Sequence, residues 1–346
     1  MIKDLLVRQA DSFSEPLETR AEIEALCGAM GDAARFISLG ISEEGREIHG
    51  VILGRGSRKA SLIGGSHGDE PLGPEALRRF IIAGIEEKEK IEDLLEEWTL
   101  YIIPQVNPDG EGRNASWIRR WPSLKDYLQL ARREPPGRDI EFGYPDMREE
   151  NRLLTRFWSN HSPFRLHISF HGMGYSEGAL LLVERHWIDR TGAVRKAFTR
   201  SAEENGLMLH DHNRKGEKGF YYIGPGFSTT PEGKMMRFHF ESSGDSETAS
   251  QFRSSSMEWI RSLGGDPLCL VTELPLFVIE GEAERKPGVP VLYNRFREAQ
   301  EDILESFSRG KKTVSLPEGL RIRPLPVGMG VGMLLGVLES ALEAAR

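Results

Sequence analysis

The sequence of 346 residues contains only two cysteines, Cys27 and Cys269, and it carries no excess of positive charge. Two cysteines are too few for the disulfide framework that stabilises small secreted domains. With 45 Lys and Arg against 53 Asp and Glu, the net charge is −8, and an acidic chain without a basic block is not typical of a protein that binds nucleic-acid phosphates. These deficits exclude a disulfide scaffold and argue against nucleic acid as a partner.

A long uninterrupted apolar run is also missing. The most apolar stretch begins at Val327 and meets a charge at Glu339, which leaves about twelve apolar residues where a membrane-spanning helix needs about 20. The first residues, MIKDLLVRQADSF, contain neither a sustained apolar region nor a small-residue cleavage site, so they do not resemble a signal peptide. We therefore expect a cytoplasmic protein with no membrane partner, and the sequence leaves its oligomeric state open.

The chain does contain short apolar runs that alternate with segments of helical periodicity. Hydrophobic residues make up 39% of the sequence, enough to bury a sizeable core. The run SLIGG (61–65) precedes the helical segment PEALRRFIIAGIEE (74–87), and strand patterns recur at 98–107, 164–172 and 267–280. This order predicts an α/β fold, with a mixed, mostly parallel twisted sheet and helices on both faces.

The sequence shows no internal repeat and no clear domain linker. We therefore expect a single catalytic domain over residues 1–346, with residues 311–346 as a C-terminal extension packed on it. Residues 213–256 are rich in Gly, Ser and Thr and are expected to form loops over one face.

The stretch SLIGGSHGDE can be interpreted in two ways. Ser66 lies in a G-x-S-x-G pattern, which presents a nucleophilic serine in many hydrolases. His67 and Glu70 instead form an H-x-x-E pair that suits a metal ion. The oxyanion-hole motif of the serine enzymes is absent, and only 65 residues precede Ser66, which leaves little room for the strands that come before such an elbow. We therefore favour the metal site.

A catalytic zinc ion needs three protein ligands and an open position for water. In FRLHISFHG, strand alternation places His167, Ser169 and His171 on one face. Since open α/β sheets bind ligands beyond the carboxyl ends of their strands, His171 is the better third ligand, and His167 is expected to be a buried, hydrogen-bonded histidine. Glu273, at the end of the last strong strand, would reach the same edge as a general base.

The ordered set EEGREIHGVILG, IGGSHGDE, NPDG, ENR, ISFHG and TELP, spanning roughly residues 35–280, resembles the zinc metallocarboxypeptidases of the carboxypeptidase A-like family. The resemblance implies one zinc ion per chain, held by His67, Glu70 and His171, with Glu273 as general base. The His₂Glu ligand set is the one that carboxypeptidase A itself uses.

The resemblance also implies residues that bind the substrate. Asn151 and Arg152 match the family's Asn-Arg pair, which binds the terminal carboxylate of the substrate, and a guanidinium fork suits that planar anion. The family places a further arginine between the NPDG turn and this pair, where it polarises the scissile carbonyl. Arg113, Arg119 and Arg120 compete for this role, and we choose Arg113.

Two departures from the family pattern concern the substrate. The family's mobile tyrosine is missing from TASQF (248–252), which precedes the pocket segment SSSMEWIR, although Tyr221 or Tyr222 could replace it in space. Met257 falls where the residue at the floor of the family's pocket would lie, which suggests an apolar or mixed pocket.

The sequence thus predicts a zinc-dependent metallocarboxypeptidase that hydrolyses the amide bond of a C-terminal residue of a peptide. The first alternative is an N-acyl-amino-acid deacylase of the succinylglutamate desuccinylase or aspartoacylase type, and a peptidoglycan-peptide hydrolase lies between the two. From a different class of protein, the alternative is a non-catalytic peptide-binding relative.

Overall fold

A computed structural model describes residues 2, 5, 11–311 and 314–346. Its strands are β1 (Ala34–Ile41), β2 (Glu47–Leu53), β3 (Arg58–Gly64), β4 (Trp98–Ile103), β5 (Leu166–Ser176), β6 (Gly178–Val183), β7 (Met208–Leu209), β8 (Tyr222–Gly224), β9 (Phe227–Thr229), β10 (Leu268–Gly281) and β11 (Leu320–Pro324). Its α-helices are α1 (Pro16–Met30), α2 (Leu72–Glu86), α3 (Glu92–Glu97), α4 (Pro108–Ile118), α5 (Leu124–Leu130), α6 (Glu149–His161), α7 (Gly192–Glu204), α8 (Gly233–Ser242), α9 (Ser246–Gln251), α10 (Ser256–Ser262), α11 (Val291–Ser308) and α12 (Val327–Ala344).

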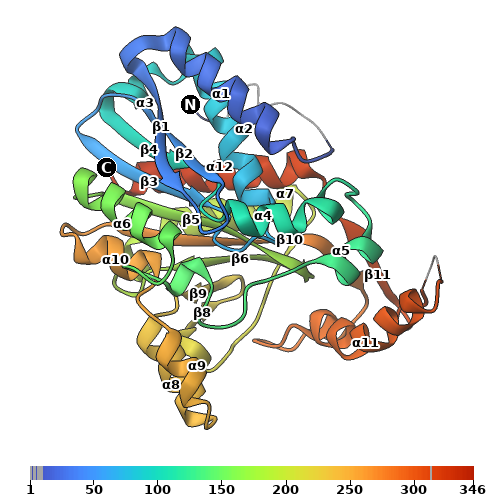
Figure 1. The fold of residues 1–346 in the computed structure, drawn as a ribbon. Helices are drawn as coiled ribbons and strands as arrows, with labels where there is room; N and C mark the ends of the chain where they lie inside the picture. Colours follow the sequence, from blue (N-terminus) through green and yellow to red (C-terminus); the bar gives the residue numbers. More distant parts are fainter. Residues whose placement is uncertain (1, 3–4, 6–10, 312–313) are drawn as a thin grey trace.

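The strands form one sheet with the order β1-β2-β4-β3-β5-β10-β6-β9-β8, while β11 pairs with β10 and β7 with β6 (Figure 1). The predicted mixed sheet with helices is confirmed, but the expectation that it is mostly parallel is wrong. Among the described residues, five of the ten strand pairings are antiparallel and five are parallel. The parallel run β4-β3-β5-β10 forms the centre, because the helical crossovers that parallel pairing requires connect these strands.

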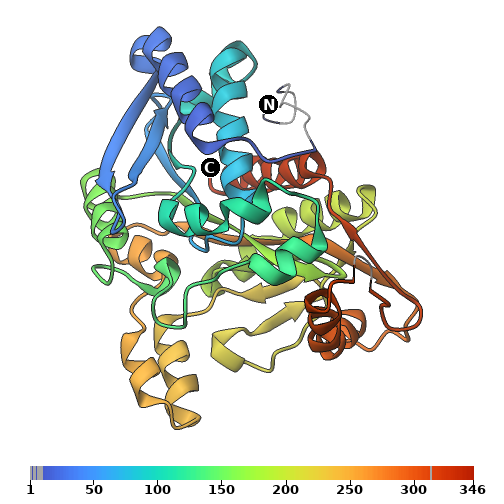
Figure 2. The same cartoon turned by 45° about the vertical axis from the view of Figure 1, so that its right-hand side comes forward.

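Helices cover both faces of this sheet (Figures 1 and 2). On one face α2 packs against α1 and α12, and α12 packs against α7; on the other face α6 and α10 contact β1 and β5. Strand alternation supplies both cores. Leu166, Ile168 and Phe170 of β5 belong to the core beneath α2 and α12, so the residues between them face the other side, where the site lies.

The C-terminal residues contribute to the core of the fold. Among the described residues, α12 is the one helix long and apolar enough by composition to span a membrane. It is 56% buried and contacts α2, α7 and β5, as a core helix does. Its apolar composition is therefore explained by packing.

Two local expectations are corrected. The NPDG segment does not form a simple turn: it begins α4, with the Asn107 side chain accepting a hydrogen bond from the Gly110 N–H at 2.9 Å and with Pro108 in the first helical turn, where its missing N–H costs nothing. Residues 213–256 are not all loop, because they contain α8 and α9, which project together from the body of the protein (Figures 1 and 2).

Candidate metal centre

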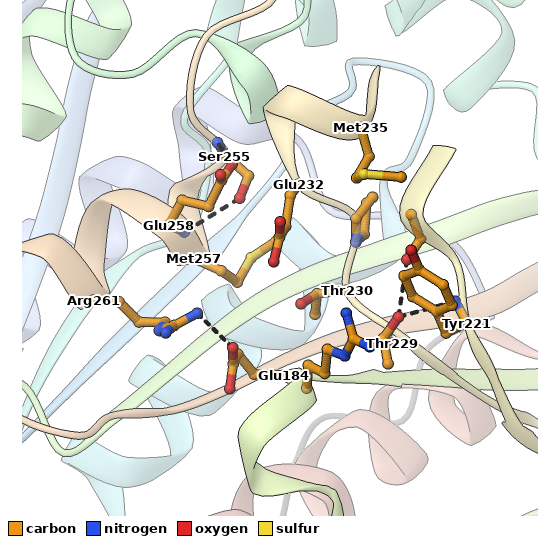
Figure 3. A pocket seen from close by; sticks show the side chains of 13 residues that line it. Glu184, Tyr221, Thr229, Thr230, Glu232, Met235, Ser255, Met257, Glu258 and Arg261 are labelled. Atoms are coloured by element: carbon orange, nitrogen blue, oxygen red, sulfur yellow. Dashed lines mark hydrogen bonds and ion pairs between the residues drawn. The ribbon is translucent and has the colours of Figure 1, made fainter. Parts of the chain in front are cut away.

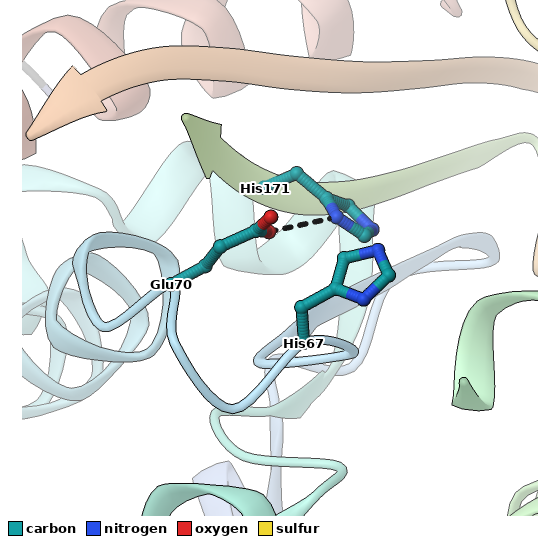
Figure 4. Close-up of side chains that lie close together, drawn as sticks. All are labelled: His67, Glu70 and His171. Carbon is teal, nitrogen blue, oxygen red and sulfur yellow. Dashed lines mark ion pairs between the residues drawn. The ribbon is translucent and has the colours of Figure 1, made fainter. Parts of the chain in front are cut away.

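Two histidines and one glutamate from separate parts of the chain meet beside the carboxyl end of β3 (Figure 4). His67 and Glu70 come from the loop between β3 and α2, and His171 comes from β5. One ligand atom of each residue lies within 4.8 Å of the other two, and Nδ1 of His171 is 2.9 Å from Oε2 of Glu70. We call these three side chains the ligand cluster. They are the three residues that the sequence analysis selected as metal ligands.

The register between β3 and β5 brings His171 to this position. The two strands are parallel, and Gly64, the last residue of β3, lies opposite Phe170. We expected His171 to lie at the carboxyl end of its strand, but β5 continues to Ser176. His171 instead lies at the level where β3 ends. The loop after β3 therefore passes directly beside it.

Two glycines allow this loop to run where it does. Gly65 has φ +74°, and a Cβ there would lie 1.9 Å from Oε1 of Gln105. A Cβ on Gly68 would lie 2.3 Å from the carbonyl carbon of Gly110, closer than any atom can be accommodated without moving backbone. His67 and Glu70 are thus carried by a loop that packs against the start of α4.

The ligand cluster has the donor set and the unsatisfied atom that a zinc ion requires. Nδ1 of His67 is buried and has no hydrogen-bond partner among the described residues, which is rare for a buried polar atom. Burial and the positive charge of Arg133 lower the pKa of His67 to about 3, so its imidazole is neutral at pH 7 and offers a free lone pair. Two imidazoles and a carboxylate form a His₂Glu set with a fourth position open. The residues present therefore fit zinc.

The charges of Glu70 and His171 depend on their neighbours. Burial would raise the pKa of Glu70, but the positive charges of Arg133 and the two histidines outweigh it and hold this pKa well below its usual range. Burial would lower the pKa of His171, yet Glu70 and Glu141 raise it well above its ordinary value. A metal ion must therefore displace a proton from His171, so the affinity for the metal falls as the pH falls.

Glu273 lies beside the ligand cluster without belonging to it. β10 and β5 are parallel, with Glu273 directly opposite His171, so the two side chains leave the sheet on the same face. Removal from water and the charge of Glu70 raise the pKa of Glu273 to about 8. A cation in the ligand cluster would offset the charge of Glu70 and lower this pKa, leaving a carboxylate that can accept a proton near neutral pH.

Arg133 is the guanidinium that reaches the ligand cluster, and the sequence analysis missed it. Its Nε donates to Oδ1 of Asp69 at 3.0 Å, and its terminal nitrogen pairs with Glu70. Arg133 follows α5 in the Pro- and Arg-rich stretch REPPGRDIEF (133–142). The unusual composition of this stretch was the available signal, but it did not indicate which arginine turns inward.

The choice of Arg113 is corrected. Its side chain lies at the surface and pairs with Glu44 and with Glu134. The two competing arginines also pair with surface carboxylates, Arg119 with Glu15 and Arg120 with Asp126. Arg113 lies on α4, and Arg119 and Arg120 directly follow it.

Glu141, another residue that the sequence analysis missed, touches the far side of His171. Its Oε2 accepts hydrogen bonds at 3.2 Å from Nε2 of His171 and from the hydroxyls of Ser66 and Ser169. Its Oε1 accepts from the Ser256 N–H at 3.0 Å and from the Ser256 hydroxyl at 2.6 Å. Burial would raise the pKa of Glu141, but the hydrogen bond and the charge of His171, together with the Ser256 hydroxyl, lower it to about 2. Glu141 is therefore a buried, fully hydrogen-bonded carboxylate.

Asn151 and Arg152 do not act together at the ligand cluster. Asn151 is buried, and its Nδ2 donates to the Ile140 carbonyl at 2.9 Å, so it supports the segment that carries Glu141. Arg152 is exposed, and it pairs with Glu149 at 2.8 Å and donates to the Asp146 carbonyl at 3.0 Å. Successive residues of a helix are about 100° apart around its axis, so one residue of the pair faces inward and the other faces outward. The expected carboxylate clamp at Arg152 is corrected on this ground.

The alternative roles for Ser66 and His167 have clear structural answers. The hydroxyl of Ser66 donates to Glu141 at 3.2 Å, so its partner is an acid and not the histidine base that a nucleophilic serine needs. His167 is buried, with Nδ1 3.0 Å from the Ser61 hydroxyl and Nε2 3.1 Å from that of Ser256. The expectation of a buried, hydrogen-bonded histidine at this position is confirmed.

Met257 lines a small cavity next to the Glu141 network (Figure 3). The open space is about 20 Å³, room for about one water molecule, so a substrate side chain could enter only if the lining moved. Tyr221 lines the same cavity, whereas the Tyr222 hydroxyl donates to Asp211 at 2.6 Å. Of the two tyrosines considered, Tyr221 is the one that shares a cavity with Met257. The other lining residues are Glu184, Arg185, Gly219, Thr229, Thr230, Pro231, Glu232, Met235, Ser255, Glu258 and Arg261.

Known proteins support the predicted resemblance. Residues 19–184 match the family model of the zinc carboxypeptidases. Carboxypeptidase B of Astacus astacus is 26% identical over 159 residues, which cover 44% of this chain and 52% of that protein. An inactive metallocarboxypeptidase, ECM14 of Ajellomyces capsulatus, is 36% identical over 118 residues, which cover 31% of this chain and 19% of that protein. The chain spans about half or less of the length of these relatives, and because one of them is named inactive, catalysis must be argued from the site.

Solved structures share the fold over nearly the whole chain. Carboxypeptidase A of Helicoverpa armigera matches with a TM-score of 0.55 at 12% identity, covering 97% of this chain and 74% of that one. Bovine thrombin-activatable fibrinolysis inhibitor, in complex with tick carboxypeptidase inhibitor, matches with a TM-score of 0.52 at 14% identity, covering 96% of this chain and 98% of that one. At these identities the likeness shows the fold alone.

The geometry predicts different consequences for the two histidines of β5. His171→Ala should abolish stoichiometric zinc binding, because it removes one of three ligands, whereas His167→Ala should retain it. Metal analysis of both purified variants after zinc loading and dialysis measures this difference. Zinc retained by His171→Ala and lost by His167→Ala would place the third ligand at His167.

Proposed function

We propose that this chain, whose residues 19–184 are related to the zinc carboxypeptidases, is a zinc-dependent amide hydrolase that releases the C-terminal residue of a peptide. One observation carries the proposal: His67, Glu70 and His171 converge within 4.8 Å beside Glu273, which is in register with His171. A ligand set next to a carboxylate outside that set is what metal-assisted hydrolysis requires.

In this proposal the imidazole of His67, the Glu70 carboxylate and Nδ1 of His171 hold one zinc ion. Zinc bound there would polarise the substrate carbonyl and increase the acidity of water. Glu273 accepts a proton from the attacking water and delivers it to the nitrogen of the leaving amine.

Arg133 takes the role that the resemblance assigns to an arginine before the Asn-Arg pair. Its guanidinium contacts Glu70 directly, so it can stabilise negative charge that develops on the carbonyl oxygen of the substrate. Because the side chain remains 46% exposed while it pairs with Asp69 and Glu70, the guanidinium is open to a substrate as well as to these carboxylates.

The segment before the pocket supports a second candidate function, because TASQF (248–252) lacks the tyrosine that the resemblance implies for a peptidase. A deacylase that acts on N-acyl amino acids, or a hydrolase that acts on peptidoglycan peptides, would use the same zinc and the same base on a differently shaped substrate.

A substrate panel separates these candidates. The zinc-loaded chain should release the C-terminal residue from peptides with a free carboxylate, and Arg152→Lys should leave this rate within about fivefold, because a surface ion pair contributes at most about 1 kcal/mol. Liquid chromatography of free and amidated peptides and of N-acyl amino acids measures turnover. Hydrolysis of N-acyl amino acids alone would favour the deacylase, and no turnover on any panel member would favour the non-catalytic relative.

Glu273→Gln should keep zinc and fold while it lowers turnover. General acid–base catalysis contributes about 10²–10⁴-fold, so kcat should fall by about this factor with substrate binding preserved. Steady-state kinetics, together with zinc analysis of the same preparation, tests the role. A rate near that of the wild type would remove Glu273 from the mechanism.

Arg133→Gln should lower kcat/KM by roughly ten- to a hundredfold, since a hydrogen bond to a charged group contributes about 1.5–3 kcal/mol. Arg113→Gln is the matched control, because it removes a surface arginine from the neighbouring segment. Kinetics at equal zinc occupancy measures both variants. A loss with Arg113→Gln and none with Arg133→Gln would return the role to Arg113.

A further inference from the structure

We propose that Glu141 is a positioning residue that holds His171 with Nδ1 towards the metal and Nε2–H towards its own carboxylate. This inference rests on zinc binding at the ligand cluster, as in the proposed function. In addition to the three ligands, Glu141 thereby influences the affinity for the metal without contacting it.

The two nitrogens of His171 face two different carboxylates. Nδ1 lies 2.9 Å from Oε2 of Glu70, within the ligand cluster. Nε2 lies 3.2 Å from Oε2 of Glu141, on the opposite edge of the ring. A neutral imidazole has one donor nitrogen and one acceptor nitrogen. If Nε2–H donates to Glu141, the lone pair lies on Nδ1, where a metal shared with His67 and Glu70 can use it.

Glu141 is itself held firmly in place. Three serine hydroxyls and one backbone N–H donate to it: Ser66 from the loop after β3, Ser169 from β5, and Ser256, through both N and Oγ, from the start of α10. With His171, these groups make five hydrogen bonds to two oxygens of a side chain that is 4% exposed. A carboxylate with this many donors has no free lone pair for a substrate, so its function is to fix what it touches.

A carboxylate on the outer nitrogen of a ligating histidine fixes its tautomer and ring orientation and increases its basicity. His167 gives a contrast on the same strand and the same face. Its two nitrogens contact the hydroxyls of Ser61 and Ser256 and no carboxylate. Glu141 therefore distinguishes the histidine that binds metal from its buried neighbour.

The test is a zinc titration of the full metal-free chain, in competition with a chromophoric chelator at pH 7. Glu141→Gln should weaken zinc binding by about 10–100-fold, the typical cost of losing such a partner. The matched control is Glu177→Gln, because Glu177 is also 4% exposed and lies 3.1 Å from a histidine, His210, that is not part of the ligand cluster. Glu177→Gln should bind zinc as the wild type does.

Replacing zinc with cobalt adds a measurement of ligand geometry that a general loss of stability would not change. The d–d absorption bands of the cobalt-loaded protein should shift in Glu141→Gln and remain unchanged in Glu177→Gln. Wild-type zinc affinity and an unchanged cobalt spectrum in Glu141→Gln would overturn the inference. If the wild type itself bound no zinc, the proposed function would fail first, so the two failures are distinguishable.

A measurement on the wild type covers the case in which Glu141→Gln does not fold. The chain has nine histidines, so the ¹⁵N-imidazole signals of His171 can be assigned in the metal-free protein as those that His171→Ala lacks, and then followed as zinc is added to the wild type. The inference expects His171 with a protonated Nε2 and a metal-bound Nδ1. The opposite tautomer would refute it.

Discussion

Parallel pairing of β3, β5 and β10 is the constraint on which the site depends. The register sets Gly64 opposite Phe170 and Glu273 opposite His171, so the end of one strand and two chemically active side chains lie at the same level. A shift by one residue would turn His171 and Glu273 to the other face of the sheet, into the core beneath α2 and α12. The hydrophobic packing of both faces therefore also positions the groups that we propose act in catalysis.

The same region concentrates negative charge. Asp69, Glu141 and Glu273 lie around the ligand cluster, which itself contains Glu70, and the positive charge among the described residues there comes mainly from Arg133 and His171. Buried charges are costly unless they are paired. Glu141 is satisfied by hydrogen bonds and Glu70 by Arg133 and His171, while Glu273 carries a raised pKa. A divalent cation would relieve this repulsion. The clustered carboxylates that destabilise the metal-free protein therefore favour metal binding.

The stretch 133–142 supplies both residues that complete the site. Arg133 approaches the ligand cluster from the side of Glu70, and Glu141 approaches from the far side of His171. Its path is stabilised by Asn151, which donates to the Ile140 carbonyl. In this chain the segment between α5 and α6 thus connects an anion-stabilising group to a group that orients a ligand.

The sequence by itself determined the features that depend on short-range geometry. His67 and Glu70 are three residues apart in one glycine-rich loop, and strand alternation places His167, Ser169 and His171 on one face, so their convergence could be predicted without a structure. The choice of His171 over His167, and of Glu273 as its neighbour, relied on the rule that parallel strands end at a common edge. The expected strand ends were wrong, because β5 continues to Ser176 and β10 to Gly281, but the parallel register still places the two residues opposite each other. The central parallel strands were predictable for the same reason.

Only the tertiary structure decided the features that depend on how distant segments fold back. The sequence does not distinguish four of the arginines that lie between the NPDG segment and the Asn-Arg pair: Arg113, Arg119, Arg120 and Arg133. The packing of α4 and α5 determines which of them turns inward. Asn151 and Arg152 form an adjacent pair in the sequence, but on α6 the first side chain faces inward and the second faces outward. Glu141 has no recognisable motif, because its role comes from three segments that meet around it: the loop after β3, β5 and the start of α10. The antiparallel margins of the sheet also depend on long-range pairing, which a local hydrophobic pattern does not encode.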